Sequence, residues 1–173
     1  MHIIIDGYNL IRQSDTLRQA ERTSLEEGRK ALIRRLVSYR RSRGHRISVV
    51  FDGWQNGPLS EERDREQGMD ILYSCRGERA DELIKRMISA AGEEIVVVTS
   101  DRGIADFAER RGYTAIPSPT FERRMEEAGA SGDFCERDSE GEDEEDRCGG
   151  KKKGAAHRLS KRKRAALAKL KKL

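Results

Sequence analysis

Three aspartates stand at the ends of short β-branched runs that read as buried strands. Asp6 ends residues 2–6, Asp52 ends residues 46–52 and Asp101 ends residues 95–101. Ligands of an open parallel sheet bind outside the carboxyl ends of its strands, so acids delivered to this edge can meet. Converged carboxylates raise one another's pKa unless a cation relieves them, and oxygen ligands suit Mg²⁺ or Mn²⁺. The pattern therefore indicates one shared cation site.

A fourth acid, Asp81, lies at the start of a helix expected over residues 80–91. At 100° per residue it falls at the edge of the apolar stripe of that helix, near the sheet, whereas Glu82 points nearly opposite. An acid so placed needs a partner, because burial disfavours its charge. Glu78, just before the helix, could join it. We therefore add Asp81 to the expected metal ligands.

Each aspartate also has a simpler explanation that needs no metal. Asp101 could cap the helix that follows it, and Asp6 and Asp52, each before a glycine, could be turn residues. Asp81 could form an exposed ion pair with Lys85 at i+4. Four separate explanations at one sheet edge are less convincing than one cation site, so we prefer the shared site.

The elements that must position these acids alternate between strand and helix. Further strands are expected over residues 71–75 and 114–116, and helices over residues 25–43, 80–91, 103–111 and 119–128. Residues 53–68 are polar and indicate a long loop. Alternating strands and helices predict an α/β fold in three layers, α/β/α, with a central parallel sheet of about five strands.

Charge divides the chain into three parts. Residues 1–130 are neutral, residues 131–148 carry nine acidic and two basic residues, and residues 149–173 carry eleven basic and no acidic ones. Such blocks usually mark disordered or interaction segments. We expect a folded domain over 1–128, an acidic flexible linker over 129–156 and a basic tail, which could form a helix, over 157–173.

The composition excludes several classes of protein. Charged residues make up 38% of the chain and hydrophobic ones 35%, and no run approaches the roughly 20 apolar residues of a membrane span. No signal peptide is visible, and three cysteines without CxxC spacing indicate reduced thiols, so a cytoplasmic protein is expected. The basic tail implies a polyanionic partner, with nucleic acid the first candidate. The oligomeric state leaves no trace in the sequence.

Four short motifs occur in a fixed order: DGYNL at 6–10, VFDG at 50–53, GERAD at 77–81 and VTSDR at 98–102. Together they resemble the NYN domains of the YacP-like family, which are PIN-like nucleases and include a ribosome-associated endoribonuclease. The resemblance covers roughly residues 1–128. It implies a PIN-like fold with a strand order of the 3-2-1-4-5 kind and a metal-dependent cut in single-stranded RNA.

The resemblance also implies roles for single residues. Asp6, Asp81 and Asp101 match the family's metal-binding acids, and Asp52 matches the acid after its second strand. Asn9 matches an amide at the site, which would orient a water or a ligand carboxylate. The expected catalytic residues are Asp6, Asn9, Asp81 and Asp101, and the expected ligands of one or two Mg²⁺ or Mn²⁺ ions are Asp6, Asp52, Asp81 and Asp101.

Substrate contacts are expected from groups that flank the acids and from the tail. Arg79 and Arg102 are nearest in sequence, although PIN-like enzymes often carry another acid at the position of Arg102. Tyr8 could stack on a base or be a packed core residue. The tail cations expected to bind RNA or the ribosome, with a steep dependence on salt, are Lys161, Arg162, Lys163 and Arg164.

These features predict a metal-dependent endoribonuclease that hydrolyses single-stranded RNA to 5′-phosphate and 3′-hydroxyl products. The expected substrate is mRNA, with the ribosome as a candidate partner. The alternative is a non-catalytic ribosome- or RNA-binding module on the same fold, in which the acids serve only as caps.

Overall fold

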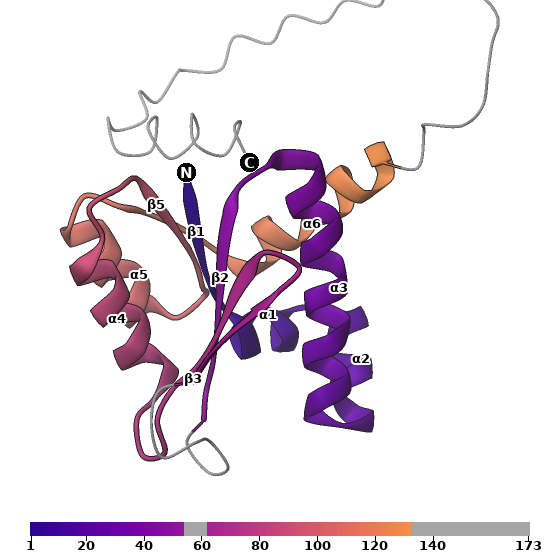
Figure 1. Cartoon of the computed structure of the whole chain (residues 1–173), viewed down its shortest axis with the longest axis horizontal. Coiled ribbons are helices and arrows are strands. Elements are labelled where there is room, and N and C mark those ends of the chain that lie inside the picture. The colour runs from indigo at the N-terminus through magenta and orange to yellow at the C-terminus, as the bar shows by residue number, and fades with distance from the viewer. Residues whose placement is uncertain (54–61, 133–173) are drawn as a thin grey trace, which may run out of the picture.

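The middle layer of the molecule is a six-stranded sheet. The computed structural model describes residues 1–53 and 62–132 (Figure 1). Its strands are β1 (His2–Asp6), β2 (Arg46–Phe51), β3 (Glu62–Glu66), β4 (Met69–Tyr73), β5 (Ile95–Val98) and β6 (Thr114–Ile116). They lie in the order β3-β4-β2-β1-β5-β6, and all neighbours are parallel except β3 and β4. The five parallel strands thus confirm the predicted 3-2-1-4-5 order.

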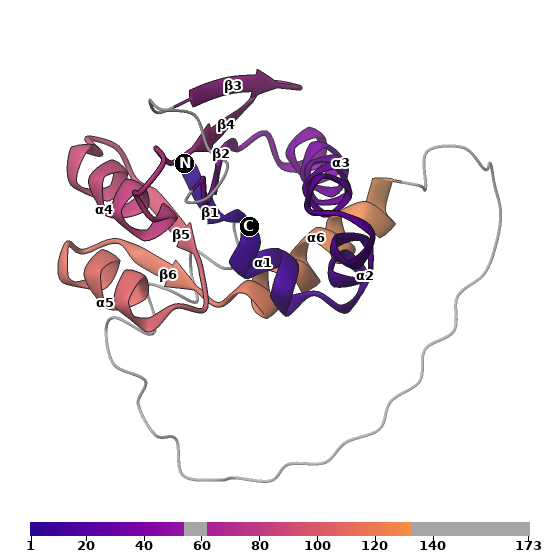
Figure 2. The same cartoon turned by 90° about the horizontal axis from the view of Figure 1, so that it is seen from below.

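Helices cover both faces of this sheet. They are α1 (Gly7–Gln13), α2 (Asp15–Thr23), α3 (Leu25–Arg43), α4 (Ala80–Ala90), α5 (Arg102–Arg110) and α6 (Ser118–Gly132). Figure 2 shows α4 and α5 on one face and α2, α3 and α6 on the other. The three-layer α/β/α architecture is therefore confirmed.

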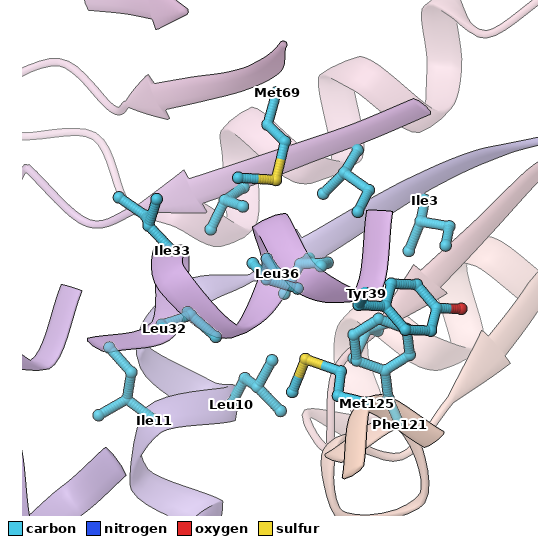
Figure 3. Close-up of a cluster of buried hydrophobic side chains, with 14 of the residues drawn as sticks. Ile3, Leu10, Ile11, Leu32, Ile33, Leu36, Tyr39, Met69, Phe121 and Met125 are labelled. Carbon is cyan, nitrogen blue, oxygen red and sulfur yellow. The ribbon is translucent and has the colours of Figure 1, made fainter. Parts of the chain in front are cut away.

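Two buried clusters hold the layers together, and the strands feed both because successive strand residues point to opposite faces. Ile3 and Ile5 pack on the side of α3 and α6, where Figure 3 shows Leu36 and its neighbours. Ile4 packs with α4 and α5. Each buried isoleucine stabilises the fold by roughly 1.5–3 kcal/mol. Asp6 continues the alternation on the side of Ile4, so its carboxyl lies toward α4 and α5.

The prediction of a loop over residues 53–68 is wrong for its last part. Residues 62–66 form β3, an edge strand antiparallel to β4. Gln67 and Gly68 make the connecting turn with φ values of 50° and 78°, as a tight hairpin turn of the I′ kind requires. Every residue of β3 is charged, so the sequence has no apolar alternation to reveal it. Charged side chains are typical of exposed sheet edges.

Two short helices near the N-terminus were also missing from the prediction. The stretch after Asp6 reads as a loop, yet α1 begins directly at Gly7. The next helix, α2, starts at Asp15, and the side chain of Ser14 caps it by accepting from the Leu17 amide. Helices of seven and nine residues are too short to show a clear period in sequence.

The acidic and basic segments expected at the C-terminal end of the chain lie mostly outside the described residues. The expected domain boundary at residue 128 lies within α6, which continues to Gly132. From residue 133 onward, the acidic linker and the basic tail are not described. Within the described ranges Cys75 is a free thiol, and none of the helices there has the length and hydropathy needed to cross a membrane.

Candidate active site

Asp6 and Asp101 end up at the same edge of the sheet because their strands are neighbours. Ile5 of β1 is in register with Val98 of β5, and β5 ends three residues before Asp101 rather than at it. Both aspartates also cap helices. The Asn9 amide donates to Asp6 Oδ1 at 3.2 Å, and the Ile104 amide donates to Asp101 Oδ1 at 3.0 Å. The capping interpretation of Asp101 is confirmed, and Asp6 is a cap as well.

A buried hydroxyl connects these two acids. Thr99 Oγ1 donates to Asp6 Oδ2 at 3.2 Å and accepts from the backbone amide of Asp101 at 3.1 Å. Thr99 is 2% exposed, so the link is shielded from water. The short segment between β5 and α5 is thereby held against the end of β1. No sequence pattern had predicted this role for Thr99.

Asp6 is the most buried of the candidate acids, with 8% exposure. Burial is the main reason why its pKa rises from 3.8 to about 6. The hydrogen bonds from Asn9 and Thr99 oppose this rise of the pKa, whereas the nearby negative charges of Asp81 and Asp101 add to it. The three carboxylates therefore act on one another across the edge of the sheet.

Asp81 comes to the same edge of the sheet from helix α4. It lies in the first turn of α4, half-buried, and it forms no ion pair with Lys85, although both residues are described. Glu78 does not join it but pairs with Arg86, with Oε1 2.6 Å from Nη1. Asp52 lies just beyond β2 and is exposed.

The side chain of Asn9 connects three segments at this edge of the sheet. Its side-chain oxygen accepts from the Ser100 amide at 2.9 Å and from Ser118 Oγ at 2.8 Å. The Ser118 amide in turn donates to Ser100 Oγ at 3.2 Å. Asn9 thus ties α1 to the segment before Asp101 and to the start of α6. Only Ser118, just before the helix-opening Pro119, gave a sequence signal, and that signal was for a helix start.

Of the expected RNA-binding residues that the structure describes, Tyr8 lies apart from Arg79 and Arg102. Arg79 precedes α4 and Arg102 begins α5, and both are exposed beside the acids. Tyr8 turns toward the α3 side, where its ring packs edge-on against Phe51 at 5.2 Å. Its hydroxyl accepts from Arg29 Nη1 at 3.1 Å. The tail cations at residues 161–164 lie outside the described residues.

With this geometry established, comparison with known proteins decides the family. The sequence matches the YacP-like NYN domain over residues 3–172. The chain belongs to this family. The YacP protein of Bacillus subtilis is 31% identical over 102 residues, which span 57% of this chain and 59% of that protein. The resemblance seen in the four motifs is therefore confirmed.

Solved structures give the same result for the fold. Two crystal structures of Rae1 (YacP) from Bacillus subtilis, one of a mutant, have TM-scores of 0.64 and 0.63. Their sequences are 26% and 25% identical to this one, and the match spans 77% and 76% of this chain and 78% and 77% of theirs. The NYN domain described here has the nuclease-like α/β fold of that family.

The acids of this NYN domain have the chemistry that a hard divalent cation needs. Their donors are all carboxylate oxygens, and the buried Asp6 carries an unfavourable charge that a cation would neutralise. Yet among the described residues no group of three or more histidines, cysteines, aspartates and glutamates is close enough to hold an ion as it stands. Asp6, Asp81 and Asp101 therefore fit a cation by the type of their donor atoms, but their side chains would have to come together to ligate it.

Proposed function

We propose that this protein is a metal-dependent endoribonuclease that hydrolyses single-stranded RNA to 5′-phosphate and 3′-hydroxyl ends. The observation that carries the proposal is the meeting of Asp6, Asp81 and Asp101 from β1, α4 and the β5–α5 segment at one sheet edge. We further propose mRNA as the substrate, cytoplasmic action and the ribosome as a partner, on the strength of the charged tail.

In this proposal, Asp6, Asp81 and Asp101 hold one or two Mg²⁺ or Mn²⁺ ions, and Asp52 is a further candidate ligand. Such an ion, when bound, lowers the pKa of its water and stabilises negative charge on a phosphate. Thr99 and Asn9 position the acids through their hydrogen bonds. Arg79 and Arg102 bind phosphates of the strand beside the acids.

The test is cleavage of a labelled single-stranded RNA by the purified full chain, with Mn²⁺, with Mg²⁺ and with EDTA. Cleavage should require the metal, and Asp101→Asn should lower the rate at least about a hundredfold, because electrostatic stabilisation of the transition state is lost. Asp106→Asn, an exposed acid on the same helix α5, is the matched control and should keep full activity. Full activity of Asp101→Asn at saturating metal would disprove the assignment.

A second candidate function has one specific observation in its favour. Asp6 and Asp101 already serve as helix caps, and no described acidic cluster is assembled for a metal. A non-catalytic RNA- or ribosome-binding module on the same fold would need nothing more. Calorimetric titration with Mn²⁺ separates the two functions. A nuclease should bind the ion and lose this binding in Asp6→Asn, whereas a binding module need not bind it.

A further inference from the structure

We infer that Arg29 binds a phosphate of the single-stranded RNA on the α3 side of the sheet edge, in a subsite built with Tyr8 and Tyr73. The inference rests on the proposed nuclease function, because it identifies where the same strand continues beyond the acids. It is carried by a half-buried guanidinium that is held by aromatic groups instead of by a carboxylate.

Arg29 is fixed by two tyrosines from two other elements. Its Nη1 donates to Tyr8 Oη of α1 at 3.1 Å, and its guanidinium carbon lies 5.6 Å from the ring centroid of Tyr73 at the end of β4. A cation over an aromatic face is attracted by about 0.5–2 kcal/mol, depending on desolvation. These contacts orient the side chain without a carboxylate in direct contact with it. Its charge acts only at longer range on Glu26, whose pKa is lowered mainly by the hydrogen bond with Lys30 and to a smaller extent by Arg29.

Two other cations on α3 are paired with acids. Lys30 lies 2.7 Å from Glu26, and Arg35 contacts Glu122 and Glu126 at 3.2 Å. Within the described ranges, by contrast, no carboxylate forms an ion pair with Arg29. A positioned guanidinium without an acidic partner is a suitable ligand for a phosphate, which it can bind with two parallel hydrogen bonds.

The aromatic support under Arg29 is rigid. Phe51 lies between the two tyrosines, edge-on to Tyr8 at 5.2 Å and stacked on Tyr73 at 5.7 Å. Phe51 itself is fully buried. Arg12 adds a second cation, with its guanidinium 5.7 Å from the Tyr8 ring. Arg12 is also paired with an acid, because its Nε lies 3.9 Å from Glu21 Oε1. Of these two cations, Arg29 is therefore the one that the rings hold without an acidic partner.

The location connects this subsite to the acids. Phe51 is in register with Tyr73 at the carboxyl end of the sheet, and Tyr8 follows Asp6 by two residues. The aromatic group lies on the α3 side of the edge, whereas Asp6 and Asp81 lie on the α4 side. A strand that crosses the edge of the sheet would thus meet the acids on one side and Arg29 on the other.

The experiment measures binding without cleavage. A fluorescein-labelled single-stranded oligouridylate is titrated with the full chain in EDTA at several salt concentrations. Arg29→Gln should weaken binding roughly tenfold at low salt, as expected for a charge-assisted hydrogen bond. It should also lower the slope of log affinity against log salt by about 0.7, the value for one phosphate contact on a single strand.

Arg34→Gln is the matched control, since Arg34 is an exposed arginine of the same helix on a different face. It should change the affinity by less than about twofold. Equal losses in Arg29→Gln and Arg34→Gln, or no loss in Arg29→Gln, would overturn the inference. Arg29→Lys gives a second reading should Arg29→Gln unfold. It should keep the salt slope but still bind several times more weakly, because an ammonium cannot pair with a phosphate through two parallel bonds; wild-type affinity would again overturn the inference.

The two proposals fail in different ways. If the wild type binds the oligonucleotide and Arg29→Gln does not, but no metal supports cleavage, the nuclease function fails and the subsite stands. If the wild type cleaves RNA and Arg29→Gln binds it as well as the wild type does, the subsite fails and the nuclease function stands.

Discussion

At the scale of single residues, Asp6 combines two roles that conflict at neutral pH. It caps α1, which favours a charged acceptor, and it is buried beside Asp81 and Asp101, which disfavours the charge. Burial has the larger effect, since the pKa rises to about 6. The fold therefore tolerates an unfavourable charge at the place where the proposed cation would bind.

Asp6→Asn should stabilise the metal-free protein at pH 8. The folded-state pKa of Asp6, about 6, lies above its ordinary 3.8. Protonation of Asp6 therefore stabilises the folded state. This stabilisation is fully present at pH values below the ordinary pKa, and it is lost as the pH rises through the folded-state pKa. The variant should gain about 3 kcal/mol in free energy of unfolding at pH 8 and little below pH 4. Urea denaturation of both proteins in EDTA at pH 8 and at pH 4 measures the difference in free energy of unfolding. An equal gain in stability at the two pH values would contradict the raised pKa of Asp6.

Gly7→Ala should destabilise the fold through a steric clash. A Cβ at Gly7 would lie 2.4 Å from Cε1 of the buried Phe51 ring, and such overpacking costs roughly 1–3 kcal/mol. Gly92→Ala is the control, because a Cβ there meets nothing within 4 Å. Thermal unfolding compares the two variants, and a Gly7→Ala protein as stable as Gly92→Ala would show that Phe51 can move aside.

At the scale of elements, the edge of the sheet is assembled from loops that depend on each other. Asn9 in α1 accepts hydrogen bonds from Ser100 and Ser118, which precede α5 and open α6. β5 ends at Val98, so Asp101 lies on a connecting segment rather than on a strand. Its position is therefore set by these hydrogen bonds, not by the sheet ladder.

Ser118→Ala should weaken this connection. Ser118 is fully buried and its hydroxyl is 2.8 Å from Asn9 Oδ1, so its removal should cost about 1 kcal/mol of stability. The rate of RNA cleavage should fall as well, because the Asp101 segment is then held by one hydrogen bond fewer. Ser89→Ala on the exposed face of α4 is the control. It also removes a serine hydroxyl and should cost less than about 0.5 kcal/mol of stability. Denaturant melts and cleavage rates that do not distinguish the two variants would refute the supporting role.

At the scale of the whole molecule, the buried residues of the two clusters lie between residues 3 and 128 within the part of the chain that the structure describes, while the family match continues to residue 172. The segment beyond carries most of the charge asymmetry, with an acidic block and then eleven basic residues.

Removal of residues 149–173 should leave the melting temperature of the domain unchanged and weaken RNA binding. For every phosphate that the shortened chain no longer binds, the salt slope should flatten by about 0.7 on a single strand. Removal of the acidic residues 133–148 alone should instead strengthen binding at low salt, because a competing polyanion is then absent. Fluorescence titrations with a labelled RNA test both truncations, and identical salt slopes for all three proteins would exclude a role for the tail.

Sequence by itself determined the alternation of strands and helices, the placement of aspartates at or just after the ends of strands, and the family. These are local properties: β-branched runs, apolar periods and short motifs are readable without knowing what packs against them. The antiparallel β3 escaped prediction because its charged residues contain no such pattern, and α1 because seven residues are too few to show one.

Only the tertiary structure decided which side chains meet at the sheet edge. Ser118 lies 109 positions from Asn9, and Thr99 lies 93 positions from Asp6. The burial that raises the pKa of Asp6 comes from elements on both sides of it, and Arg29 acquires its tyrosine partners from α1 and β4. Interactions of this kind depend on how the chain packs in space, and no local pattern of residues encodes them.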